Sequence, residues 1–480
     1  MNRRMVFSTV GKMISAEALM LVLPLMTAIL YGERCVWSIF LTIVIAAVVG
    51  VGLTLFCRPK STVIYARDGF CITALAWILM SAIGALPFVF SGEIPNYIDA
   101  FFETVSGFTT TGSSILANVE VMSHGLLFWR SFTHWVGGMG VLVFVMAILP
   151  SVSDRSIHIM RAEMPGPVVG KIVPRARDTA SILYKIYIVM TLVEILLLLC
   201  GGMPLFDSIV HAFGTAGTGG FGIKADSIGG YSPYLQWVIT VFMFLFGVNF
   251  NLYYLLLIRR FRSVLQSTEL WVYLGIVVAS TGLITANILS LCANFAEALR
   301  HAAFQVSSII TTTGYATTDF DLWPGFSKAI LLILMFVGAC AGSTGGGIKV
   351  SRVVLLWKTV CRQIRQLVHP RAVGVVKFEG KSVDETTTNS IGTYLGVYIF
   401  CFVAIFLLLC LEDASFATHF SAAAACFNNI GPGFDAVGPT LNFAAYSGFS
   451  KVLLSFAMLL GRLEIYPLLI ALYPGTWKKK

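Results

Sequence analysis

The sequence has little charge: Asp, Glu, Lys and Arg make up only 12% of its 480 residues, about half the share found in soluble domains. Its ten cysteines form no CxxC pair and no Cys/His cluster, which argues against a zinc site or a disulfide scaffold. It also has no HExxH or GxSxG pattern, which argues against a membrane enzyme. Apolar residues dominate instead, at 57% of the chain and a mean hydropathy of +0.83. The composition predicts an all-α polytopic membrane protein, with room for about ten spans of about 20 residues each.

A four-part unit recurs along the chain after two leading apolar runs. Each copy has a long apolar run, a shorter apolar stretch, a Gly/Thr-rich turn and a second long apolar run. The shorter stretches cannot cross a bilayer core of about 30 Å, yet they are too apolar for aqueous loops. We expect each to be a re-entrant half-helix followed by extended backbone that lines a water-filled cavity. The stretches are 98–105, 206–213, 296–309 and 414–427.

The units divide the chain into five segments. Residues 1–66 hold the two leading spans, and residues 67–150 hold pore repeat one. Residues 151–262 combine a cytoplasmic link with repeat two, 263–358 hold repeat three, and 359–480 combine a second link with repeat four. The second apolar runs at 126–149, 235–258 and 449–472 are each expected to form one continuous span.

Basic residues gather on one side of this ten-span arrangement. They occur before the first span, after the second, in the links between repeats and at the C-terminus. The positive-inside rule makes that side cytoplasmic and places both termini there. The opposite side carries the half-helices and many acids, which are expected to concentrate cations at an outer mouth. These acids are Glu93, Asp99, Glu103, Asp207, Glu297, Glu412 and Asp413.

The four turns share a glycine when they are aligned on Gly112, Gly219, Gly314 and Gly433. A Thr/Gly strand can turn its carbonyl oxygens toward an axis, because glycine tolerates the backbone angles required. Four such strands would form rings of oxygens that replace the hydration shell of K⁺. One such turn would be an ordinary Gly-rich loop. Four such turns, each at the end of a non-spanning stretch, favour a selectivity filter. The candidate ligands are Thr110, Thr111, Gly112, Gly217, Thr218, Gly219, Thr312, Thr313, Gly314, Gly431, Pro432 and Gly433.

The apolar run 326–357 is too long for one straight span, and glycines interrupt it. Each glycine costs a helix about 1 kcal/mol relative to alanine, so the cluster should unwind the helix. Unwound backbone inside a membrane must line a cavity or be buried in protein. A gating loop across the pore is therefore favoured over close helix packing through small residues. The candidate gate glycines are Gly342, Gly345, Gly346 and Gly347.

A few charged side chains lie within apolar runs, and each is a candidate functional group. Arg462 is either part of the gate or a structural partner of Glu464. Arg130 is expected to be a structural partner of half-helix acids or carbonyls. For Lys185 and Glu194, a proton relay and simple packing both stay open.

The four turns, the two leading spans and the stretch 342–349 (GSTGGGIK) resemble the Trk/Ktr/HKT superfamily of potassium transporters over nearly the whole chain. The TrkH branch is the most similar. The resemblance implies four parallel repeats around one pseudo-fourfold pore, a gating loop at 342–347, and a basic residue at Arg462 that contacts this loop. It also implies a homodimer regulated by a cytosolic TrkA-like nucleotide-binding ring. Gly112 implies a preference for K⁺ over Na⁺, whereas Pro432 departs from the family pattern.

These patterns predict a potassium-uptake transporter of the bacterial cytoplasmic membrane. It would pass K⁺ down the electrochemical gradient or couple it to H⁺ or Na⁺. K⁺ is expected as the transported ion, without an organic cofactor. The lipid bilayer, a second copy and the TrkA-like ring are the expected partners, and nucleic acid is not. A membrane enzyme and an organic-solute transporter are the alternatives; the latter would show inverted repeats.

Overall fold

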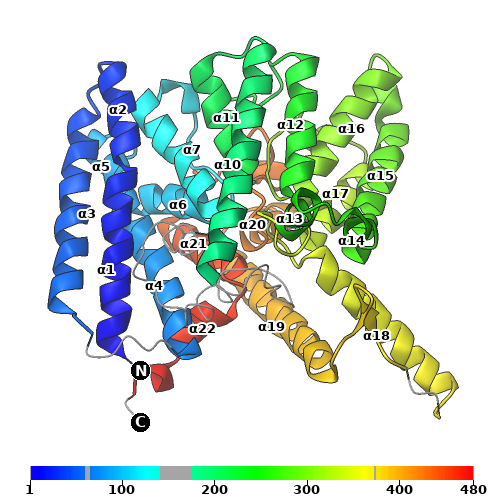
Figure 1. The fold of residues 1–480 in the computed structure, drawn as a ribbon. Coiled ribbons are helices and arrows are strands. Elements are labelled where there is room, and N and C mark those ends of the chain that lie inside the picture. The colour runs from blue at the N-terminus through cyan, green and yellow to red at the C-terminus, as the bar shows by residue number, and fades with distance from the viewer. Residues whose placement is uncertain (1, 60–64, 141–175, 372–373, 479–480) are drawn as a thin grey trace.

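The computed structural model describes residues 2–59, 65–140, 176–371 and 374–478. Nearly every regular element within these ranges is a helix (Figure 1). The two described strands, β1 (Lys377–Phe378) and β2 (Lys381–Ser382), form a short antiparallel hairpin between α18 (Val350–Val368) and α19 (Glu385–Leu409). The all-α fold predicted from the composition is confirmed.

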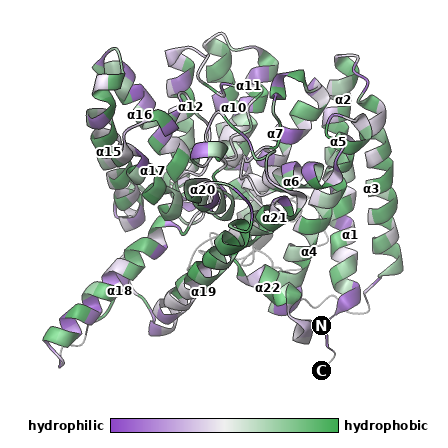
Figure 2. Ribbon diagram, turned by 180° about the vertical axis from the view of Figure 1, so that it is seen from behind, coloured by the Kyte–Doolittle hydropathy of each residue, from purple (hydrophilic) through white to green (hydrophobic). Residues whose placement is uncertain are grey.

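Within the described ranges, six helical stretches are long and apolar enough to cross a membrane. The first is α1 (Arg3–Met20) with its continuation α2 (Val22–Leu30), and the second is α3 (Val36–Phe56). Only 22% of the apolar stretch of α3 is buried inside the protein. Figure 2 shows this helix at the edge of the molecule, coloured mostly as hydrophobic. Such an apolar outer face suits hydrocarbon rather than water. The other four are α4 (Ala66–Gly84) with α5 (Leu86–Ser91), α10 (Ala176–Cys200), α15 (Thr268–Ile288) and α19.

Each repeat begins with one of the last four of these stretches and continues into a shorter helix. The shorter helices confirm the predicted half-helices. Their small side chains allow close packing, and all residues of Ala422–Ala425 are fully buried. The segment boundaries near residues 66, 150, 262 and 358 stay predictions. The half-helices are α6 (Tyr97–Phe108), α11 (Leu205–Gly217), α16 (Phe295–Ile310) and α20 (Phe416–Phe427).

The second helices of repeats two and four are broken, so the prediction of continuous spans at 235–258 and 449–472 is wrong. In repeat two, α12 (Pro233–Phe246) and α13 (Phe250–Leu257) meet at an angle of 91°. In repeat four, Glu464 and Ile465 separate α21 (Gly448–Arg462) from α22 (Tyr466–Leu472). Their φ angles of 53° and 68° are positive, whereas an α-helix requires negative φ. Among the described residues, six helical stretches, or seven if the bent pair is one span, are long and apolar enough to cross a membrane, and the count of ten stays a prediction.

Repeat three has the break that the glycines predict. Residues 338–349, here called the glycine loop, separate α17 (Gly325–Val337) from α18. In repeat one, α7 (His124–Gly138) ends just before the described range does; the rest of the run to residue 149 and the basic link at 151–175 lie outside the described residues. The short α14 (Phe261–Leu265) precedes α15. Figure 1 shows both termini at the end of the molecule toward which α18 and α19 extend.

Candidate functional site

The four turns after the half-helices share one backbone conformation. Each starts with a left-handed residue: Thr110 (φ 54°), Thr218 (54°), Thr312 (59°) and Asn429 (58°). β-Branched residues rarely adopt this conformation, and strain of this kind gathers at functional sites. Two positions later each turn has a glycine with positive φ: Gly112 (83°), Gly220 (74°), Gly314 (83°) and Gly431 (106°).

This conformation corrects the predicted alignment in two of the four turns. The equivalent glycines are Gly220 and Gly431, and not Gly219 and Gly433. Hydrogen bonds back to the half-helices repeat in the same register: the middle residue donates its backbone N–H to a carbonyl five residues earlier at 2.8–2.9 Å. The pairs are Thr111–Ser106, Gly219–Gly214, Thr313–Ser308 and Ile430–Ala425. The sequence could not choose between neighbouring glycines in these turns, because only their backbone angles distinguish them.

The turns close into a ring in chain order. A Cβ placed on each of the four glycines would point at the carbonyl oxygen of the middle residue in the next turn. For Gly431 that oxygen belongs to Thr111, at 2.9 Å, so the fourth turn contacts the first. The other three contacts are tighter, and any side chain there would displace the neighbouring carbonyl. They run from Gly112 to Gly219, from Gly220 to Thr313 and from Gly314 to Ile430.

A hollow of about 140 Å³ lies against this ring, and all four glycines with positive φ line it. Gly219 and Gly433 are not among its lining residues, which agrees with the corrected register. The charged side chains in its described lining are Arg130 and Lys224, both basic. The expectation that acids would gather at the mouth is therefore wrong for this hollow.

The acids near the ring have structural partners instead. Glu103 of α6, fully buried, pairs with Nε of Arg130 at 2.6 Å. Its carboxylate also accepts from the Ser114 hydroxyl and the Ile115 backbone N–H, each at 3.0 Å, which holds the strand after Gly112. Asp99 pairs with Lys451 of α21 at 2.7 Å. Arg130 also lies 3.5 Å from the centre of the Phe221 ring, so it joins repeats one and two.

The glycine loop packs against the ring from the side of the Thr312 hydroxyl. The backbone N–H of Gly346 donates to Oγ1 of Thr312 at 2.6 Å. A Cβ on Gly345 would lie 2.9 Å from the carbonyl oxygen of Thr311. Only glycine allows this close approach of the loop to the turn, so the glycine triplet has a steric cause.

The loop is also joined to the bend in repeat two. The backbone N–H of Phe250 donates to the carbonyl of Gly342 at 3.0 Å, and that of Cys340 donates to Gly247 at 3.1 Å. The Thr344 hydroxyl donates to the Phe246 carbonyl at 3.2 Å. These contacts use backbone groups that the bend between α12 and α13 leaves unpaired.

Arg462 joins the loop to repeat one. Its guanidinium donates to the carbonyl of Thr344 at 2.9 Å, and to those of Gly137 and Gly138 at 2.5 and 2.8 Å. Glu464, the alternative partner predicted from the sequence, forms an ion pair of 2.6 Å with Arg352 of α18. Elements from all four repeats therefore meet at the glycine loop.

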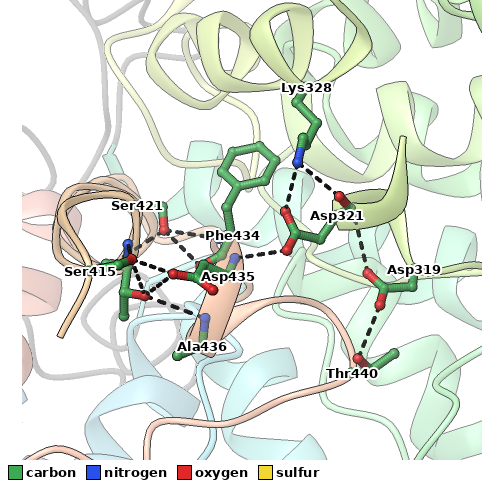
Figure 3. Close-up of polar contacts among 10 residues, drawn as sticks. Asp319, Asp321, Lys328, Ser415, Ser421, Phe434, Asp435, Ala436 and Thr440 are labelled. Carbon is green, nitrogen blue, oxygen red and sulfur yellow. Dashed lines mark hydrogen bonds and ion pairs between the residues drawn. The ribbon is translucent and has the colours of Figure 1, made fainter. Parts of the chain in front are cut away.

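Beside the hollow, side chains of repeats three and four form a polar contact, here called the outer clasp (Figure 3). Lys328 of α17 pairs with Asp321 at 3.3 Å, and Asp321 accepts from the backbone N–H of Asp435 at 3.1 Å. The Asp435 carboxylate accepts from the hydroxyls of Ser415 and Thr418. The clasp ties the segment after the third turn to the segment after the fourth.

Comparison with known proteins assigns the family. The sequence model of the TrkH family, described as a cation transport protein, matches residues 37–476. The Trk system potassium uptake protein TrkH of Salmonella typhimurium strain LT2 is 35% identical, with 100% of both chains covered. The Trk system potassium uptake protein TrkG of Escherichia coli K12 is 34% identical, with 99% of each covered. The crystal structure of the potassium transporter TrkH from Vibrio parahaemolyticus matches with a TM-score of 0.89 at 32% identity, over 100% of each chain. The chain belongs to the TrkH family.

Membership of the TrkH family confirms a multi-pass cation transport protein, so the alternatives of a membrane enzyme and an organic-solute transporter are set aside. The candidate ligands predicted from the sequence did not include Gly220, Asn429 and Ile430. Asparagine tolerates the left-handed conformation, which is the signal that could have placed Asn429 beside the three threonines. Lys185 and Glu194 both lie on α10, the first exposed and the second fully buried.

Proposed function

We propose that this chain takes up K⁺ through the ring of turns and that the glycine loop gates the path. The observation that carries the proposal is the closed ring of four turns with one backbone conformation. Each half-helix ends at its turn, so its negative C-terminal end would face the ion. The backbone carbonyls of the triplets 110–112, 218–220, 312–314 and 429–431 would replace the hydration shell. The names of the relatives, potassium uptake proteins, support the choice of ion.

The ion moves down its electrochemical gradient in this proposal. The triplets offer only backbone, hydroxyl and amide oxygens, which bind a cation without taking up a proton. The glycine loop lies against the ring and would block the way onward, with Gly342, Gly345, Gly346 and Gly347 at its centre. Arg462 would add a positive charge to this barrier. Since it contacts the Thr344 carbonyl, it would also hold the loop in place.

The basic links face the cytoplasm of a bacterium, with both termini on that side. Two copies form a homodimer, and a TrkA-like nucleotide-binding ring docks on the basic face. Purification of the chain co-expressed with a TrkA-like protein tests the docking of this ring. Separate elution of the two proteins, together with K⁺ flux that does not depend on nucleotide, would contradict it.

The main experiment measures ion flux into vesicles that contain the purified chain. We expect K⁺ entry without any H⁺ or Na⁺ gradient and much slower Na⁺ entry. Expression in a bacterium that lacks its own K⁺ uptake should restore growth on low K⁺. A variant whose glycine loop is shortened within 342–347 serves as the open control. No K⁺ entry through either protein would contradict the proposed function.

A further inference from the structure

Glu269, in the first turn of α15, accepts hydrogen bonds from backbone within the glycine loop and just after it. One carboxylate oxygen accepts from the backbone N–H of Ala341 at 2.7 Å and from that of Ser351 at 3.1 Å. These two residues flank the segment 342–350, so a single side chain closes the loop at its base. Glu269 is only 5% exposed, and an acceptor shielded from water in this way binds its donors strongly.

The contact with Ser351 also completes α18. The first N–H groups of a helix have no partner within it, and Lys349, the N-cap residue before α18, makes no side-chain cap. Glu269 supplies an acceptor at this helix end. The position of α18 and the position of the loop are therefore fixed by the same carboxylate.

The hairpin of β1 and β2 reaches Glu269 from the other side. Its two-residue turn, Glu379–Gly380, has positive φ at both positions, as a tight hairpin requires. One oxygen of Glu379 accepts from the Ser267 hydroxyl at 3.2 Å and from the backbone N–H of Glu269 at 3.1 Å. The hairpin thus caps α15 at the residue that holds the loop.

The hairpin is in turn fastened to α18. The Lys358 ammonium donates to the carbonyl of Lys377 at 2.9 Å, and Phe378 packs against a cluster that includes Leu355 and Ile391. The link between α18 and α19 is thereby connected to the loop through two carboxylates in series. A movement of the hairpin would change the support of Glu269 without touching the ring of turns.

We propose that Glu269 is a positioning residue that holds the glycine loop in its closed conformation through hydrogen bonds. We also propose that the hairpin controls the position of Glu269 through Glu379. The proposal deepens the proposed gate and rests on it. A regulator bound to the segment between α18 and α19 would open the path by drawing the hairpin away from α15. The K⁺ selectivity of the ring would stay the same, since none of these groups contacts the four turns.

The test measures K⁺ and Na⁺ flux per folded protein in vesicles for five variants. Glu269→Ala should raise K⁺ flux about tenfold, which corresponds to the loss of the hydrogen bond that Ala341 of the loop donates to this buried acceptor. Glu269→Gln keeps an oxygen acceptor and should restore most of the closed behaviour. Glu379→Ala should raise flux less, and the double variant Glu269→Ala/Glu379→Ala should not exceed Glu269→Ala alone. Glu385→Gln, at an exposed acid at the start of α19, is the matched control and should leave flux unchanged.

The outcomes separate this proposal from the proposed function. If shortening the loop raises K⁺ flux while Glu269→Ala does not, the gate stands and the role of Glu269 is overturned. A merely structural role would lower the folded yield and leave flux per folded protein unchanged or reduced, and Gln would give no rescue. A changed K⁺/Na⁺ ratio in Glu269→Ala would also overturn the proposal. Absence of flux even with the shortened loop would overturn the proposed function itself.

Discussion

The ring of turns and the barrier beneath it follow different rules, although the same four repeats build both. In the ring, four turns share their φ angles and hydrogen bonds even where their residues differ, as Gly219 and Ile430 do at one equivalent position. At the barrier, each repeat contributes something different. Repeat three supplies the loop, repeat two a bend of 91°, and repeat four the guanidinium of Arg462.

The difference follows from what each region has to do in the proposed function. A ring of ion ligands needs equal oxygens on all sides, and backbone carbonyls provide them whatever the side chains are. A gate needs only one movable part. A single loop is therefore enough, and its contacts in the other repeats need not be repeated fourfold. Changes in the ring should therefore alter selectivity, and changes at the barrier should alter the rate.

The largest expected effect is on folding, where a buried ion pair supports the ring. Arg130→Met would leave Glu103 buried without its cation, which should cost about 3–5 kcal/mol. The double variant Arg130→Met/Glu103→Gln should recover part of this loss. Thermal unfolding of the purified protein measures both. Lys328→Met, at a half-exposed pair of the outer clasp, should cost less than about 1 kcal/mol. Equal losses at the two sites would contradict this ranking.

The ring also shows where reading the sequence succeeds and where it stops. Hydrophobic run lengths were enough to predict the half-helices and the break in repeat three, because both reflect what hydrocarbon tolerates. They could not give the register of turns two and four, which depends on backbone angles at Gly220 and Gly431. The partners of Arg462 and Glu269 were also out of reach, because carbonyls and N–H groups from distant repeats leave no residue pattern.

The next largest effect separates Gly431 from Gly433 and so tests the corrected register. Gly431→Ser puts a side chain at a φ of 106° beside the Thr111 carbonyl, and should lower the K⁺/Na⁺ flux ratio about tenfold. Gly433→Ser meets Ser421 and Val437 outside the ring and should lower stability while leaving the ratio unchanged. The reverse result would restore the alignment on Gly433. Flux of both ions into vesicles gives the measurement.

An effect of similar size is expected for the rate of transport at the barrier. Arg462→Ala removes a positive charge and a contact of the glycine loop, and should raise K⁺ flux about tenfold, equal to about 1.4 kcal/mol. Combining it with a shortened loop should add little, because both changes remove one obstruction. Arg352→Ala, which breaks the pair with Glu464, is the control and should lower stability without a comparable rise. Reduced flux in well-folded Arg462→Ala protein would rule out the barrier role.

The smallest effect belongs to the outer clasp, where repeats three and four meet at an exposed carboxylate. Hydrogen bonds from Ser415 and Thr418 hold the pKa of Asp435 below its ordinary value of 3.8. Because the folded protein lowers this pKa, the carboxylate adds stability above pH 3.8, and the gain is lost as the pH falls through the lower folded value. Asp435→Asn should therefore lower the free energy of unfolding at neutral pH by less than about 1 kcal/mol, since solvent screens the site. The loss should appear as a lower unfolding temperature. The gap between the two proteins should close in acid, whereas Asp413→Asn, at another exposed acid of repeat four, should open no gap. A gap that stayed constant with pH would mean that Asp435 acts through its shape rather than its charge.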